Sequence, residues 1–231
     1  RDKLVTGVQT CALPILTSSI STPPSFMVAT PSTDASYLLL TYLGPDLPKQ
    51  YQIASISPLV LRLVEANEAF EKVVKLYRQP SKEYTTIPVN GRDLNILIMK
   101  PSTFRANSYY PLLMNVYGGP YSQKVTQTWS LDYNEYLVEK LGMVVAIVDG
   151  AGTGYRGVAF SQSTRLHLGV QEAADQIQSI LYLVNNTDYI NSGKIGVWGW
   201  VSQLDSSLWI DTPELWRIYG LERVGSQQRV D

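Results

Sequence analysis

The sequence predicts an α/β protein in which a short antiparallel β meander precedes a mixed sheet flanked by helices. Three observations predict this class. Short β-rich runs separated by strong turns fill residues 25–56, a hairpin signal follows at Asn90-Gly91, and apolar runs then alternate with two helical stripes up to residue 199. Such alternation is typical of a sheet whose parallel strands are joined by helical crossovers.

The composition limits the classes of function. The chain has 231 residues, of which 45% are hydrophobic, and this content is ample for a core. Its formal net charge of −1 gives no electrostatic footprint for nucleic acid or an anionic membrane surface. No apolar run reaches the roughly 18 residues of a membrane-spanning helix. The single cysteine, Cys11, cannot form an internal disulfide, and the single histidine, His167, limits every hypothesis that needs an imidazole base. We expect no metal and no cofactor.

The first part of the chain is interpreted as a foreign segment followed by the meander. Residues 1–15 have no clear period, and Pro14 breaks their short apolar stretch, which makes a poor secretory signal. They resemble a translated sequencing adapter, and we expect them to be foreign or disordered. The meander is expected to hold three short strands joined by tight turns, as in one blade of a propeller: Phe26–Thr30, Tyr37–Tyr42 and Tyr51–Ile56.

The remaining elements follow in order. Apolar residues at helical spacing between Ala66 and Tyr77 predict a helix that Pro80 ends, and Asn90-Gly91 predicts a two-residue hairpin turn. Helical stripes are predicted over 133–141, ending at Gly142, and over 170–184, where Glu172 and Asp175 favour the positive end of the helix dipole. The predicted strands are Tyr84–Val89, Leu94–Met99, Leu112–Tyr117, Met143–Val148 and Ile195–Trp198. We expect a mixed sheet with right-handed crossovers.

The stretch from Lys194 to Trp200 builds the approach to a nucleophile elbow. In this turn, Gly-x-Ser-x-Gly follows a strand and lifts a serine above the sheet. Gly199 and Trp200 fill the first two positions, but Val201 stands where the serine should be and no second glycine follows. Valine cannot attack a carbonyl. From Val201 to the end the pattern breaks, no further strand is expected, and we interpret 201–231 as an unrelated tail.

Other motifs favour plainer interpretations. The glycines at 152, 154 and 157 mimic a dinucleotide-binding fingerprint, but no helix pattern starts among them and no acidic residue ends a second strand. We therefore expect a loop that needs positive φ angles. Ser202 is one residue out of register for a nucleophile and is interpreted as a surface serine. Asn185-Asn186-Thr187 is a glycosylation sequon, a triplet that also arises by chance.

Several segments, in the same order, resemble the prolyl oligopeptidase family of serine peptidases, specifically its dipeptidyl peptidase IV branch. They are Gly44-Pro45-Asp46-Leu47-Pro48, Tyr110-Pro111-Leu112-Leu113, Val116-Tyr117-Gly118-Gly119-Pro120 with Ser122-Gln123-Lys124, Asp149-Gly150-Ala151-Gly152-Thr153-Gly154-Tyr155, and Trp198-Gly199-Trp200. The resemblance covers about residues 25–200. It implies the last strands of a β-propeller, followed by the N-terminal half of an α/β-hydrolase sheet. The implied domains are a foreign or disordered 1–15, a propeller end at 16–60, a linker helix at 61–80, a partial peptidase domain at 81–200 and the tail at 201–231.

The resemblance implies an enzyme that removes N-terminal dipeptides, with proline or alanine second, through an acyl-enzyme on serine. Tyr117 matches the tyrosine that stabilises the oxyanion, and Gly199 and Trp200 flank the nucleophile position, which Val201 occupies. The family's aspartate and histidine lie well beyond that position, and His167 does not match the family's base. The resemblance implies a peptide substrate, leaves a homodimer of the parent open, and places the parent in the secretory pathway, anchored or extracellular.

Two classes of function remain open. In the first, the gene encodes a serine dipeptidyl peptidase, and this chain is a truncated, misread copy that is inactive alone. A frameshift or retained intron near the Val201 codon would explain the sudden loss of resemblance. In the second, the gene encodes a non-catalytic relative that uses its surfaces to bind a partner. This second class predicts an intact hydrolase sheet after the replaced serine.

Overall fold

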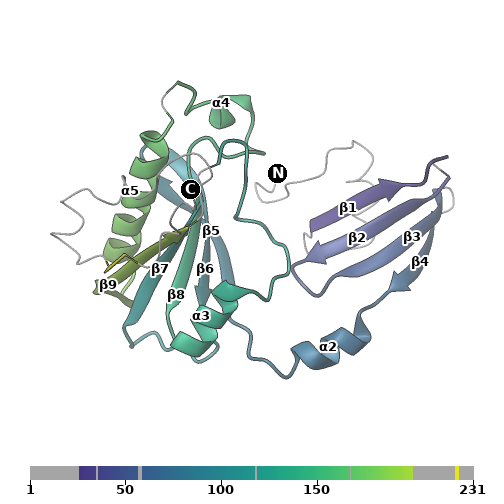
Figure 1. Cartoon of the computed structure of the whole chain (residues 1–231), viewed down its shortest axis with the longest axis horizontal. Helices are drawn as coiled ribbons and strands as arrows, with labels where there is room; N and C mark the ends of the chain where they lie inside the picture. The colour runs from purple at the N-terminus through teal and green to yellow at the C-terminus, as the bar shows by residue number, and fades with distance from the viewer. Residues whose placement is uncertain are drawn as a thin grey trace, which may run out of the picture. The chain divides into compact units, whose positions relative to one another are not determined.

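The computed structural model describes residues 26–34, 36–56, 59–117, 119–166, 168–199 and 222–223. The predicted foreign segment, His167, Trp200, Val201, Ser202 and most of the predicted tail lie outside these residues. The chain divides into two compact units (Figure 1). Unit 1 comprises the residues up to Tyr77 together with Thr126–Ser130, and unit 2 comprises Arg78–Val125 and the residues from Leu131 onward.

Unit 1 is built on an antiparallel sheet of four strands in sequential order. The strands are β1 (Phe26–Pro31), β2 (Leu38–Gly44), β3 (Lys49–Ile56) and β4 (Leu59–Glu65). The first three confirm the predicted meander. The sequence did not predict β4, because apolar residues fill its positions almost continuously and hide the period of two that marks a half-buried strand. This strand is defined by its antiparallel pairing with β3.

The helix that follows, α2 (Glu68–Val74), is shorter than the helical spacing predicts. Within it only Val74 is buried, whereas Phe70 and Val73 are exposed, so its apolar stripe covers little core. One ring nevertheless has a partner in the same unit. Phe70 meets Trp129 edge to face, with 5.5 Å between ring centroids.

Trp129 belongs to a short segment, residues 126–130, by which the chain returns to unit 1 after having entered unit 2. The backbone N–H of Trp129 donates to the carbonyl of Leu43, at 2.7 Å. The returning backbone also packs directly on Gly44, where a Cβ atom would overlap the carbonyl oxygen of Gln127. Residue 44 is therefore limited to glycine by close approach of another backbone.

Unit 2 contains a mixed sheet in the order β10-β9-β7-β8-β6-β5. Its strands are β5 (Ser81–Val89), β6 (Arg92–Lys100), β7 (Tyr110–Val116), β8 (Val144–Asp149), β9 (Ile190–Gly199) and β10 (Glu222–Arg223). The β5, β6 and β8 strands pair antiparallel, and β7 pairs parallel with both β8 and β9. The hairpin turn is as predicted, with φ of 48° at Asn90 and 74° at Gly91.

The expectation of no strand beyond Val201 was wrong for two residues. The β10 strand pairs parallel with Gly196 and Val197 of β9. The backbone groups on the outer edge of β9 supply a template for such pairing, which does not depend on an apolar pattern in the added strand.

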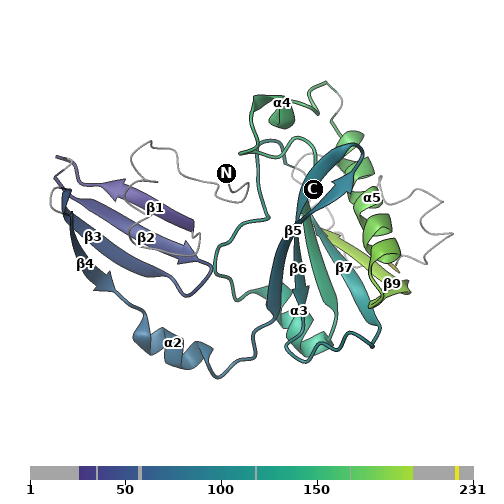
Figure 2. The same ribbon diagram turned by 180° about the vertical axis from the view of Figure 1, so that it is seen from behind.

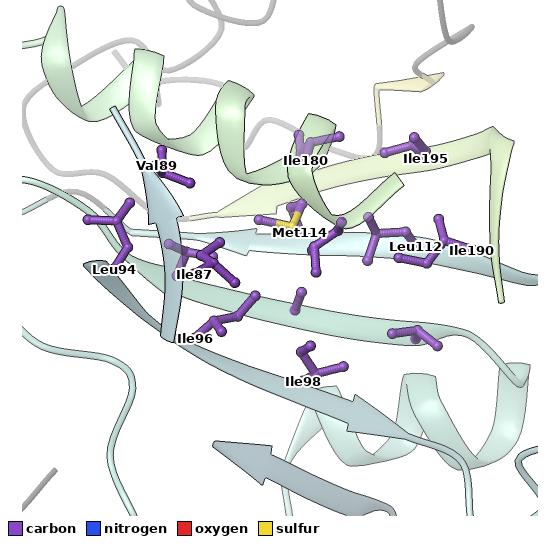
Figure 3. Packing of buried hydrophobic residues seen from close by; sticks show 14 residues of the cluster. Ile87, Val89, Leu94, Ile96, Ile98, Leu112, Met114, Ile180, Ile190 and Ile195 are labelled. Atoms are coloured by element: carbon purple, nitrogen blue, oxygen red, sulfur yellow. The ribbon is translucent and has the colours of Figure 1, made fainter. Parts of the chain in front are cut away.

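Helices cover both faces of this sheet (Figure 2). On one face, Ile180 and Leu183 of α5 (Gln171–Asn186) pack against alternate residues of β5 to β9, as Figure 3 shows for Ile180. On the other face, Leu137 and Val138 of α3 (Tyr133–Leu141) pack against the intervening residues of β6, β7 and β8. The predicted end of α3 is confirmed, because Gly142 adopts the left-handed conformation with φ of 65°.

Candidate active site

The candidate site lies where the three parallel strands β7, β8 and β9 end. Val116 at the end of β7 is the register partner of Gly199 at the end of β9. The two backbones approach so closely that a Cβ on Gly199 would overlap the carbonyl oxygen of Val116. Tyr117, the next residue after β7, is therefore placed beside the position where the chain leaves Gly199.

Tyr117 is half-buried, and its ring has neighbours from its own loop. A Cβ added to Gly119 would lie 2.9 Å from the Tyr117 hydroxyl oxygen, so the glycine leaves room for the ring. The ammonium of Lys124 lies 5.7 Å from the ring centroid, which is within the range of a cation–π contact. Within the described residues, no side chain hydrogen-bonds the Tyr117 hydroxyl.

Lys124 is itself held by two asparagines, of which Asn115 is buried and Asn134 is half-buried. Its Nζ donates to Oδ1 of Asn115 at 2.7 Å, and Nδ2 of Asn115 donates to Oδ1 of Asn134 on α3 at 2.8 Å. Burial lowers the pKa of the Lys124 ammonium, and the nearby carboxylates of Asp132 and Asp149 oppose this shift. The hydrogen bond to Asn115 therefore fixes the position of the Lys124 Nζ over the Tyr117 ring.

Asp149 is the last residue of β8, and its side chain holds the loop that carries Lys124 and Val125. Its two carboxylate oxygens accept from the backbone N–H groups of Lys124, at 2.9 Å, and Val125, at 3.1 Å. The side chain is 2% exposed. Burial raises the pKa of Asp149, although its two hydrogen bonds and the positive charges of Arg156 and Lys124 act in the opposite direction.

The loop after β8 binds the loop after β7 through its backbone. Gly154 N–H donates to the carbonyl of Ser122 at 2.9 Å, and Tyr121 N–H donates to that of Gly152 at 3.0 Å. Gly152 and Gly157 have φ of 85° and 89°. This confirms the interpretation of the glycine-rich stretch as a loop requiring positive φ, and the helix after it, α4 (Val158–Ser161), has four residues.

Asp175 on α5 ties this loop to the β5–β6 hairpin. The sequence places Asp175 at the helix start as a favourable charge, but the side chain is fully buried. It accepts from Nδ2 of Asn90 at 2.7 Å and from the backbone N–H of Ala151 at 2.9 Å, and Arg92 lies 3.6 Å away. Its role is therefore to fix loops, and the general dipole argument missed these specific partners.

The structure thus brings two of the predicted site residues, Tyr117 and Gly199, to one edge of the sheet. Sequence reasoning did not assign roles to Asn115, Lys124 or Asp149. The available signal was a polar residue at the end of an apolar strand, which indicates the carboxyl edge of a parallel sheet. In the described part of the chain, no three His, Cys, Asp or Glu side chains group as metal ligands, and no helix is long and apolar enough to cross a membrane.

The chain is similar to known proteins over part of its length. The model of the prolyl oligopeptidase family matches residues 129–202. A probable dipeptidyl-aminopeptidase B of Coccidioides posadasii is 35% identical over 171 residues, which are 73% of this chain and 18% of that protein. Its counterpart in Phaeosphaeria nodorum is 35% identical over 179 residues, covering 77% of this chain and 20% of that protein. The chain thus spans about a fifth of the length of these relatives.

A solved structure agrees. The crystal structure of Porphyromonas gingivalis dipeptidyl peptidase 4 matches with a TM-score of 0.72 and 36% identity, over 78% of this chain and 26% of that one. This likeness confirms the predicted fold class, in which the last strands of a β-propeller precede the first half of an α/β-hydrolase sheet.

Proposed function

Because the compared part of this chain is related to the dipeptidyl peptidase branch of the prolyl oligopeptidase family, we propose that the parent protein is a serine exopeptidase. The parent removes dipeptides with proline or alanine in second place from the N-termini of peptides. The observation that carries this proposal is the juxtaposition of Tyr117 with Gly199 at the carboxyl edge of the sheet.

The described residues account for one part of such a mechanism. An acyl transfer passes through a tetrahedral intermediate, whose oxyanion needs hydrogen-bond donors already in place. Tyr117 carries a hydroxyl that can donate and follows β7, whose neighbour β9 leads to the nucleophile position. Its loop is fixed by Asp149 and by the 150–154 loop. In the parent, a serine after Trp200 attacks the carbonyl, a histidine moves the proton, and an aspartate orients the histidine.

The 231-residue polypeptide, in contrast, is proposed to be inactive by itself. Val201 follows Trp200, and a valine side chain offers neither a nucleophile nor a proton acceptor. The chain is expected to give no turnover of a Gly-Pro chromogenic substrate and no labelling by a fluorophosphonate probe that reacts with activated serines. Serine-dependent turnover by this chain would overturn the proposal.

Val201 also favours the second candidate, a non-catalytic relative that acts by binding a partner. A read of the source transcript and gene across the Trp200 codon separates the two. A restored frame with serine after Trp200 would support the peptidase. If Val201 is encoded in an intact exon and hydrolase sequence resumes after it, the binding protein is the correct description.

A further inference from the structure

The sequence contains a single Asn-x-Ser/Thr triplet, Asn185-Asn186-Thr187, and the structure places it at the surface. The triplet spans the last two residues of α5 and its C-cap, Thr187. Glycosylation of asparagine in such a triplet requires a surface position, because the attached oligosaccharide is bulky and hydrated. Asn185 is exposed, which meets this requirement.

The three side chains have different uses in the folded chain. Nδ2 of Asn186 donates to the carbonyl of Tyr182 at 2.8 Å, and Oγ1 of Thr187 donates to that of Leu183 at 2.7 Å. Both bonds join a side chain of the triplet to a backbone carbonyl one turn earlier in α5. The side chain of Asn185 makes no hydrogen bond with any other described residue. Its amide can therefore be substituted without loss of a helix-capping contact.

The position of Asn185 also keeps a glycan away from the candidate site. The α5 helix ends four residues before β9 begins at Ile190, so the C-terminal end of α5 lies at the edge of the sheet where β9 starts (Figure 1). Asn185 is the second-last residue of this helix. Tyr117 lies at the opposite edge, where β7 and β9 end. Thr187 is extended, with φ of −134° and ψ of 135°, so the chain leaves the helix at the third residue of the triplet.

We infer that Asn185 is an acceptor site for N-glycosylation when the chain enters the secretory pathway. In the reaction, Nδ2 of Asn185 forms a bond to the anomeric carbon of an oligosaccharide carried on a polyprenyl pyrophosphate. The bond from that carbon to the pyrophosphate oxygen breaks, the lipid pyrophosphate leaves, and the amide loses one proton to the transferase. The modification forms whether or not the parent is a peptidase.

The test is translation of the full chain, behind a cleavable signal sequence, in the presence of microsomes that contain oligosaccharyl transferase. We expect one discrete decrease in electrophoretic mobility that peptide N-glycosidase removes. N185Q and T187A should abolish the shift. T187S keeps the triplet, and N186Q removes only the bond to Tyr182, so both should retain it.

Two results would overturn the inference. Absence of a shift in the wild-type chain, when a known glycoprotein is modified in the same reaction, would overturn the inference, as would a shift that survives in N185Q. A second measurement tests the structural part. Because the Asn185 side chain makes no described hydrogen bond, circular dichroism should give N185Q the same melting temperature as the unmodified wild-type chain. A clearly lower melting temperature would show that the side chain does make a stabilising contact.

Discussion

Replacing Asp149 by alanine should weaken unit 2 strongly. The substitution leaves the backbone N–H groups of Lys124 and Val125 without an acceptor in the folded state. A buried donor without a partner costs about 1–3 kcal/mol, so two cost about 2–6 kcal/mol. Removal of a carboxylate that is 2% exposed recovers part of this cost. We expect a net loss of about 2–4 kcal/mol, a large share of the roughly 5–15 kcal/mol that stabilises a typical domain.

Two measurements on the full chain test this expectation. Urea unfolding followed by tryptophan fluorescence should show a midpoint lowered by about 1–2 M, given typical slopes of about 1–3 kcal/mol per molar urea. Hydrogen–deuterium exchange should accelerate at the amides of Lys124 and Val125. Asp188→Ala is the matched control, because Asp188 is exposed and its side chain has no hydrogen bond within the described chain, and its effect should stay within about 0.5 kcal/mol. If Asp149→Ala matched this control in both measurements, the anchoring role would be refuted.

The same carboxyl group predicts a pH dependence. Burial raises the pKa of Asp149 in the folded chain above the ordinary value of 3.8, so the folded state holds this proton more tightly than the unfolded state. The contribution of Asp149 to stability therefore falls as the pH rises from 3.8 through the raised folded pKa, and returns as the pH falls. Asp149→Asn should remove this component when urea midpoints are compared between about pH 4 and pH 7. Parallel curves for the two proteins would contradict the shift.

Three further substitutions test the backbone geometry by the same urea assay. Gly199→Ala should cost about 1–3 kcal/mol because the added Cβ overlaps the carbonyl oxygen of Val116. Gly193→Ala, where the atom nearest to the added Cβ lies at 3.4 Å, should cost clearly less. Equal losses of stability would argue against a close approach of the two backbones at the end of β9. Asp132→Ala removes the capping box of α3 and should cost about 1 kcal/mol, and an unchanged midpoint would mean that the cap is not formed in solution. Gly91→Ala places a side chain at a φ of 74° and should cost about 1–2 kcal/mol, which a stabilised variant would refute.

Local rules predicted those parts of the fold that local chemistry determines. The Asn90-Gly91 turn and the end of α3 at Gly142 both depend on residues that accept positive φ, and both are confirmed. The pattern of buried strands likewise predicted the mixed sheet, because each strand carries its own apolar run. The β4 and β10 strands were missed, since pairing with a neighbouring strand defines them more than any pattern of their own.

The candidate site was predicted less completely. Resemblance indicated Tyr117 and Gly199, and the structure places them at one edge. The role of Asp149 could not be predicted, because its partners are amides 25 and 24 residues away in sequence and no local spacing encodes that pairing. Asp175 was misjudged for the same reason: the groups that donate to it lie on a hairpin and a loop that only the tertiary fold brings to the helix.

The return of residues 126–130 to unit 1 means that neither unit is a continuous stretch of chain. The backbone passes between the units three times, near residues 77, 125 and 130. A protein cut once after Tyr77 would therefore leave Trp129 attached to the wrong half, without Phe70 and the carbonyl of Leu43. Melting of the β meander would also release the C-terminal end of the loop that Asp149 holds, so disorder in one half would spread by covalent linkage toward Tyr117. Proteolytic nicking of the meander and mobility of the sheet edge at Tyr117 would then rise together, although they belong to different units.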